Sequence, residues 1–227
     1  MEHKESKKEE KTSKKKSDKI LVWSSIALII ILAFLFGVIY LFKQPVNTIE
    51  DLNRLNIEGK LRSEDGYLYN EVYSFIKIDD LWYTQLKSPS GNVEYNIPFH
   101  FGPKEVEDLN MEGKLDERFT NSTDIHISIN PLSKEANTAL AVSEFTGNII
   151  KSFGKRPIIS CDRNETDNCQ IRPIVTCDDK DKAVVQFKED EETRILLSGN
   201  CITLQGQGRE LVRAVDRILL KWYGIMD

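Results

Sequence analysis

Two histidines, His100 and His126, are the side chains of this 227-residue sequence best suited to acid–base chemistry. Both fall in segments that alternate apolar and polar residues, as strands do. Nucleophilic catalysis would also need a serine or cysteine beside such a base, and the sequence has no G-x-S-x-G motif. We therefore predict no catalytic residue, cofactor or metal. The alternative is an envelope hydrolase or transferase that uses His100 or His126 with nearby carboxylates.

Four cysteines form the second set of reactive side chains: Cys161, Cys169, Cys177 and Cys201. An even number confined to one exported region indicates two disulfides, for which three pairings exist. We favour Cys161–Cys169 across a short loop and Cys177–Cys201 between two strands. A zinc site is the alternative, and it is disfavoured because the sequence has no C-x-x-C motif and no histidine near the cysteines.

A basic row follows one face of the last predicted helix and consists of Arg209, Arg213, Arg217 and Lys221. Its i, i+4 spacing places the four side chains one above another. Such a row can dock an acidic partner or lipid headgroups. A solvated face balanced by Glu210 and Asp216 is the interpretation that we favour.

Two N-x-S/T sequons, at Asn121 and Asn164, are candidate glycosylation sites. Both fall in segments predicted to be exported loops, where a glycan is tolerated. A chain of this composition yields about as many sequons by chance, so their presence alone does not indicate a glycoprotein.

Residues 20–42 contain no charged side chain and are dominated by Ile, Leu, Val and Phe. A helix of this length reaches about 34 Å, which suffices for a hydrocarbon core of about 30 Å. A cleaved signal peptide would have a shorter apolar region and a small-residue cleavage site, and no such site follows. We predict a transmembrane signal anchor that stays in the protein.

Orientation follows from the basic residues that flank the span. Seven lysines lie in the fifteen residues before it, whereas the fifteen residues after it hold only Lys43 and Arg54. We therefore expect residues 1–19 to be a disordered cytoplasmic tail, and the remainder to be extracytoplasmic. The exported part carries 23 basic against 31 acidic residues, a net charge of −8 that argues against nucleic acid as a partner.

Hydrophobic periodicity predicts an α+β fold beyond the anchor. Residues 43–66 are expected to form a stalk or first helix, and residues 67–131 an antiparallel β meander. The meander has four predicted strands: Tyr67–Ile78, Leu81–Lys87, Asn92–Phe101 and Asp124–Asn130. Pro98 cannot donate to a ladder, so its strand is expected at an edge or to be bulged there.

Residues 132–227 are predicted to form an α-β-β-β-β-α region that contains the four cysteines. Its first helix is Ser133–Phe153, ended by Gly154, and its last is Gly208–Tyr223. Between them we expect the strands Arg156–Cys161, Arg172–Cys177 and Ala183–Phe187, then Thr193–Leu197 turning into Cys201–Leu204. The patterns leave open whether this region and residues 67–131 share one core.

One short sequence occurs twice, as LNIEGKL at residues 55–61 and as LNMEGKL at residues 109–115. A functional interpretation makes these two equivalent ligand-binding loops. We favour two similar structural segments in which Gly59 and Gly113 supply a permissive backbone.

The C-terminal pattern of residues 199–226 (GNCITL, then LVRAVDR and WYGIM) and the segment IPFHFGP at residues 97–103 resemble those of uncharacterised single-pass archaeal surface proteins. The resemblance implies the same membrane topology and a related lineage. It implies no activity, ligand or catalytic residue.

Together these features predict a single-pass protein of the cell membrane. Its expected partners are the lipid bilayer, through residues 20–42, and an envelope protein or glycan. We expect it to act as a non-enzymatic binding or structural module of the cell envelope.

Overall fold

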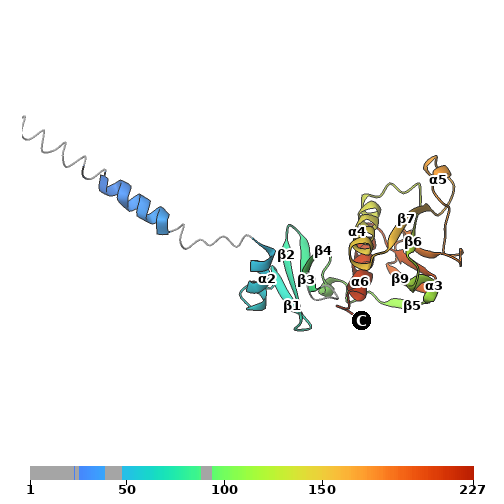
Figure 1. Ribbon diagram of the computed structural model, residues 1–227. Helices are drawn as coiled ribbons and strands as arrows, with labels where there is room; N and C mark the ends of the chain where they lie inside the picture. Colours follow the sequence, from blue (N-terminus) through green and yellow to red (C-terminus); the bar gives the residue numbers. More distant parts are fainter. Residues whose placement is uncertain (1–22, 24–25, 39–47, 88–93) are drawn as a thin grey trace, which may run out of the picture. The chain divides into compact units, whose positions relative to one another are not determined.

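The computed structural model describes residues 23, 26–38, 48–87 and 94–227 of the chain (Figure 1). The chain divides into two compact units, Met1–Thr48 and Ile49–Asp227. The predicted tail, residues 1–19, lies outside the described residues, as do residues 43–47 of the predicted stalk.

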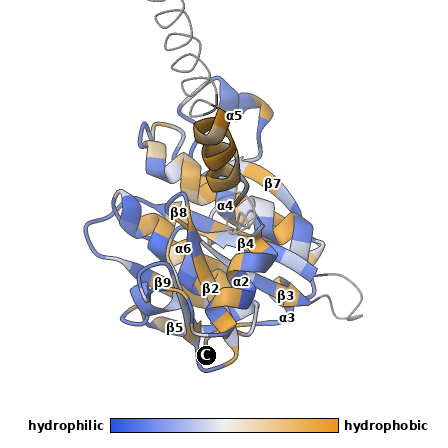
Figure 2. Cartoon of the chain, turned by 90° about the vertical axis from the view of Figure 1, so that its left-hand side faces the viewer, coloured by the Kyte–Doolittle hydropathy of each residue, from blue (hydrophilic) through white to orange (hydrophobic). Residues whose placement is uncertain are grey.

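Residues 26–38 form a helix made mainly of hydrophobic residues (Figure 2), and its residues 26–37 are exposed. The exposed fraction runs from 44% at Ile26 to 72% at Phe34. Within the described ranges, no helix has both the length and the apolar composition needed to cross a bilayer. The span predicted over residues 20–42 continues past both ends of this helix into residues outside those ranges, so it stays a prediction.

The smaller sheet has four antiparallel strands in the order β1-β2-β3-β4. These are Gly66–Tyr69 (β1), Tyr73–Ile78 (β2), Leu81–Lys87 (β3) and Glu94–Phe99 (β4). Helix α2 (Ile49–Ile57) packs on β1 and β2, where Asn56 Nδ2 donates to the carbonyls of Tyr67 and Phe75. Pro98 lies in the edge strand β4, as predicted.

The prediction of one strand over Tyr67–Ile78 is wrong, because the segment is a hairpin of β1 and β2. Asn70 and Glu71 turn the chain with φ of 49° and 59°. Aromatic residues recur on both sides of this turn, so periodicity alone hides it. The predicted turn at Asp79 and Asp80 is confirmed, with φ of 48° and 65°, as a tight hairpin turn requires.

The larger sheet is mixed and has the order β5-β9-β10-β8-β6-β7. Its strands are Met111–Leu115 (β5), Asp124–Ile129 (β6), Arg156–Cys161 (β7), Ala183–Lys188 (β8), Arg194–Gly199 (β9) and Cys201–Gln205 (β10). The predicted hairpin is confirmed as β9–β10, the antiparallel pair, and the other neighbours are parallel. The short element η1 (Pro103–Glu105) connects the smaller sheet to the larger, and the short helix α3 (Glu117–Thr120) connects β5 to β6.

Strand β6 corrects the prediction that Asp124–Asn130 is the fourth strand of an antiparallel meander. It pairs in parallel with β7 and β8. Alternation in a strand reveals its faces but not its neighbours. The long helix that follows β6 is the crossover that a parallel pair requires. Strand β5 escaped prediction because its centre, residues 112–114, reads Glu-Gly-Lys.

Helices α4 (Ala136–Phe153) and α6 (Arg209–Trp222) lie side by side on one face of the larger sheet (Figure 1). Gly154 ends α4 in the left-handed conformation, as predicted, with φ of 61°. Phe145 of α4 is fully buried, and its ring lies 5.6 Å from that of Trp222. These helices and the inward side chains of the sheet form the main core.

On the opposite face of the sheet, Val175 and Cys177 pack against Val184 of β8 and Cys201 of β10. The short helix α5 (Asn168–Ile171) precedes them and lies beside the end of β7, where Cys169 is bonded to Cys161. The predicted strand Arg172–Cys177 is wrong, since it makes only one isolated bridge, between Cys161 and Ile174. The segment pairs with the edge strand β7 only at Cys161 and then continues over the sheet face. Ser128 Oγ of β6 donates to the Val175 carbonyl at 2.6 Å.

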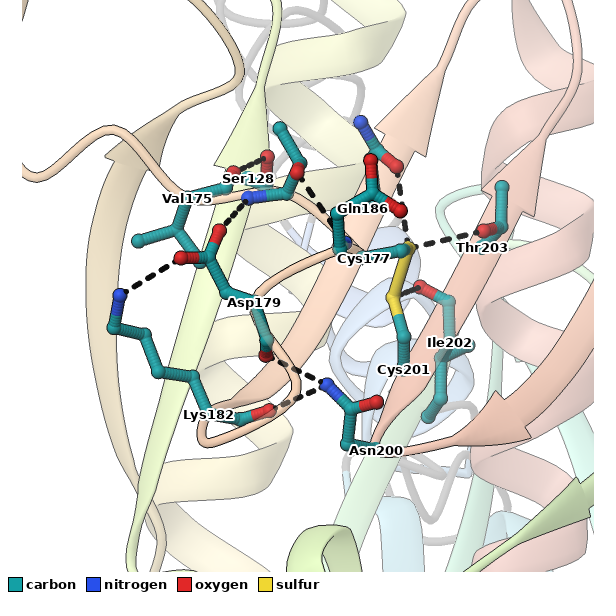
Figure 3. Close-up of a disulfide and its surroundings, with 12 residues drawn as sticks. Ser128, Val175, Cys177, Asp179, Lys182, Gln186, Asn200, Cys201, Ile202 and Thr203 are labelled. Carbon is teal, nitrogen blue, oxygen red and sulfur yellow. Dashed lines mark hydrogen bonds and ion pairs between the residues drawn. A yellow bond between two sulfur atoms is a disulfide. The ribbon is translucent and has the colours of Figure 1, made fainter.

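Both predicted disulfides are confirmed, Cys161–Cys169 and Cys177–Cys201, so the zinc alternative for these cysteines is wrong. Figure 3 shows the second bridge, beside which Asn200 Nδ2 donates to the carbonyls of Asp179 and Lys182. The bridged residues are 8 and 24 positions apart. Loop-closure entropy assigns such bridges about 2.5 and about 3.5 kcal/mol of stability.

The two sheets share one core, which answers the question that the sequence left open. Phe75 and Phe99 of the smaller sheet belong to the same buried cluster as the residues of α4 and α6. The Phe99 ring lies 6.0 Å from that of Tyr223. Tyr73 Oη also donates to the Gly224 carbonyl at 2.9 Å.

The two copies of the repeated sequence form different structures. Residues 55–61 contain the end of α2, whereas residues 109–115 contain strand β5. The copies share a left-handed glycine, with φ of 68° at Gly59 and 89° at Gly113. At Gly113 a Cβ atom would lie 2.0 Å from the Leu197 carbonyl oxygen of the neighbouring strand β9. This position therefore accepts no other side chain.

Replacement of Gly113 by alanine is expected to lower the free energy of unfolding by more than about 1 kcal/mol, since it adds both backbone strain and a steric clash with β9. Gly147→Ala is the matched control, because nothing lies within 4 Å of a Cβ there, and alanine in a helix stabilises by about 0.5–1 kcal/mol. Urea denaturation of both variants measures the difference. Equal midpoints would contradict the close β5–β9 approach.

Candidate functional site

Three ionisable side chains that are distant in sequence meet beside the end of β4. His100 follows that strand, Glu144 comes from α4, and Asp216 comes from α6. His100 Nδ1 lies 2.6 Å from Glu144 Oε2, and one nitrogen or oxygen atom from each of the three lies within 4.8 Å of the others. We call this group the His100 cluster.

Asp216 is the most deeply buried member, with no exposed surface. One carboxylate oxygen, Oδ2, accepts a hydrogen bond of 2.7 Å from the Phe101 backbone N–H. The other, Oδ1, has no hydrogen-bond donor among the described residues. Burial, followed by the adjacent carboxylate of Glu144, raises the pKa of Asp216 well above its usual range.

The packing of α4 and α6 explains why the side chains of the His100 cluster are buried together. Helix α6 is enclosed by α4, the larger sheet and η1, so nearly all of its circumference is covered. Glu144 lies on the side of α4 that faces α6 and has 7% of its side chain exposed. His100, with 27% exposed, stands between these carboxylates and solvent.

Two hollows open at His100. One, of about 290 Å³, lies between the smaller sheet and α4 and is lined by Tyr95, Pro98, Glu144 and Lys151 among others. The second, of about 520 Å³, has polar walls that include Lys77, Glu105 and Arg209. His100 lines both hollows, so a solute in either could reach the cluster.

The basic row was predicted as a solvated face, and the structure corrects this for its two middle members: Arg209 and Lys221 are exposed, whereas Arg213 is half-buried and Arg217 is buried. Arg213 donates to the Glu105 carbonyl and pairs with Asp108 and Glu210. Arg217 is only 9% exposed and donates to the carbonyls of Leu109 and Asp227.

Arg209, Lys221 and the predicted partner Asp216 each have different surroundings. Arg209 stacks over the Phe101 ring at 4.9 Å, and Lys221 is exposed. Asp216 forms no ion pair with the arginines of its helix, although Glu210 pairs with Arg213 as predicted. Arg213 and Arg217 therefore hold α6 within the domain, while Arg209 and Lys221 remain at the surface.

His126 is placed differently from His100. It lies on β6, where Nδ1 is 3.1 Å from Ser160 Oγ of the neighbouring strand β7. Ser160 is fully buried and donates to the Ile158 carbonyl, so it is not accessible as a nucleophile. Burial, and then the positive charge of Lys182, lower the pKa of His126.

The two sequons lie on the surface. Asn121 directly follows α3, and Asn164 lies in the segment between β7 and α5. Both side chains are exposed, so both could accept a glycan.

Comparisons of the chain with family models, with curated proteins and with solved structures found no match. Arguments on function therefore rest on the residues and their geometry. Sequence reasoning named His100 but missed Glu144 and Asp216. The available signals were the one acidic residue of α4, Glu144, and an acid, Asp216, among the apolar residues of α6.

His126 should make stability depend on pH. Its folded pKa is below the unfolded value of about 6.5, so the unfolded chain binds more protons and the contribution present above about pH 6.5 is lost as the pH falls. Wild-type protein should thus lose more stability than His126→Gln between about pH 7.5 and about pH 5. Thermal denaturation at both pH values tests this, and parallel losses in the two proteins would contradict it.

Proposed function

We propose that this protein is a single-pass membrane protein whose residues 49–227 form an extracytoplasmic, non-enzymatic binding module of the cell envelope. The observation that carries the proposal is the pair of disulfides, because such bridges form and persist in oxidising compartments. All four cysteines of the chain are used in them.

The anchor in this proposal is the uncharged stretch of residues 20–42. Its support is the exposed apolar surface of residues 26–38, which water disfavours and lipid accepts. The lysines before the stretch favour a cytoplasmic N-terminus. The resemblance of the C-terminal pattern to single-pass archaeal surface proteins agrees with this topology.

The surface that we assign to the partner is the hollow between β4 and α4. Tyr95 and Leu140 line it and are 46% and 37% exposed. Aromatic and aliphatic side chains around a polar base are the usual composition of a binding site. An envelope protein or a glycan is the partner class that this location favours.

The second candidate function is an envelope hydrolase or transferase, and one specific observation favours it. The 2.6 Å contact between His100 and Glu144 is the arrangement in which a carboxylate orients an imidazole for proton transfer. The hydrogen-bonded partner of His126 is the Ser160 hydroxyl instead of a carboxylate, so His100 is the base in this alternative.

The double substitution Ile30→Arg and Ile31→Arg is expected to release the protein from membranes. Each arginine near the centre of a span raises the free energy of membrane insertion by about 2.5–3.5 kcal/mol. Leucines at the same positions are the matched control and should leave the protein in the membrane after alkaline carbonate extraction. Retention of the arginine variant, or four reactive thiols in unreduced wild-type protein, would contradict the anchored and exported topology.

A photo-crosslinking residue at position 95 is expected to capture the partner in native membranes, whereas one at the exposed Glu191, outside the hollow, should not. Failure to crosslink at position 95 would remove the support for the binding surface. Turnover of envelope glycans or peptides that is lost in His100→Gln and kept in His126→Gln would replace the binding module by the enzyme.

A further inference from the structure

The His100 cluster places the carboxylates of Glu144 and Asp216 within 4.8 Å of each other, with the single imidazole of His100 beside them. Glu144 has His100 as its hydrogen-bonded partner, and Asp216 Oδ1 is buried with no donor in the described part of the chain. The arginines of α6 are directed elsewhere: Arg209 stacks over the Phe101 ring, Arg213 pairs with Asp108 and Glu210, and Nε and Nη2 of Arg217 donate to the carbonyls of Leu109 and Asp227. Unpaired buried acceptors are costly, so the cluster calls for a positive charge.

A metal ion can supply that charge. We propose that His100, Glu144 and Asp216 bind one divalent transition-metal ion, for which zinc is the best match. One imidazole nitrogen and two carboxylate oxygens are all ligand types that zinc accepts. Calcium and magnesium prefer sets made entirely of oxygen, which this cluster does not provide.

The arrangement of the three atoms is compatible with one ion. Zinc holds such ligands at about 2.0–2.2 Å, so their mutual separations are about 3.3 Å. The three atoms lie within 4.8 Å of one another, and the 2.6 Å contact between His100 and Glu144 would lengthen slightly on binding. His100 and Glu144 both line the hollow beside β4, which gives the ion a route to the site.

Three protein ligands leave a fourth zinc position open, as in sites where zinc binds a water molecule or an exchangeable group. The hollow of about 290 Å³ adjoins the cluster, so this position would be reached from the surface that we assign to a partner. The metal site does not depend on that assignment or on the membrane anchor, because its ligands all lie within residues 49–227.

A proton shared by Glu144 and Asp216 is the competing explanation of the same geometry, since like charges in contact raise a carboxyl pKa. In that case the cluster is neutral without metal. The two explanations differ in what they predict for metal binding, which makes them separable by experiment.

The test uses full-length protein in detergent, stripped with a chelator, in which His3 and His126 are both replaced by glutamine. Zinc titration by calorimetry and metal analysis after desalting should then give one zinc per chain. His100→Gln in this background should weaken binding at least about 100-fold, more than the 10–100-fold cost of losing a residue that merely orients a ligand. Glu144→Gln should do the same.

Cobalt provides a readout of the ligands themselves, since its visible absorption reports nitrogen and oxygen donors directly. Absorption should appear in the parent protein and disappear in His100→Gln, while Glu117→Gln on α3, exposed and outside the cluster, keeps it. Circular dichroism confirms that each variant is folded. No retained zinc in the parent, or equal affinity in His100→Gln, overturns the proposal in favour of the shared proton.

Discussion

The burial of α6 is the constraint on which residues 49–227 depend. Nine of its residues are buried, among them Asp216 and Arg217. A helix covered on nearly every side must satisfy each of its polar groups from within the protein. The carbonyls of Leu109 and Asp227 accept from Nε and Nη2 of Arg217, and the Phe101 backbone N–H donates to one oxygen of Asp216. Arg217 Nη1 and Asp216 Oδ1 are buried without a partner among the described residues. Phe101 and Leu109 lie in the segment between β4 and β5, so their bonds to α6 hold the two sheets together.

Local patterns predicted much of the fold. The disulfide pairing, the β9–β10 hairpin, the edge position of Pro98 and the end of α4 at Gly154 all depend on residues close together in the chain. The pairing of strands was harder to predict, because alternation of apolar and polar residues does not identify the neighbouring strand. Strand β6 lies between β7 and β8 rather than in the meander, and the segment around Val175 packs on a sheet face rather than forming a further strand.

The candidate site was only partly predictable for a related reason. His100 could be singled out by residue type, whereas its partners lie 44 and 116 positions further along the chain. Asp216 reads as a member of a charged helix face, next to residues that normally meet solvent. Its burial follows from how α4 and η1 enclose α6, a tertiary arrangement that helical periodicity does not contain.

The strand order also determines when the domain can form during synthesis. Strand β5 pairs with β9, about eighty residues later, and the central strands β8 and β10 stand between β6 and that pair. The chain is synthesised from its N-terminus, so the unit β6–α4–β7 is complete early. Strand β5 has no complete partner strand until residue 199 has been added. Cys177 likewise waits for Cys201. The larger sheet therefore closes in one late step, and a chain halted before its last thirty residues keeps an unpaired β5, an unpaired thiol and an uncovered core.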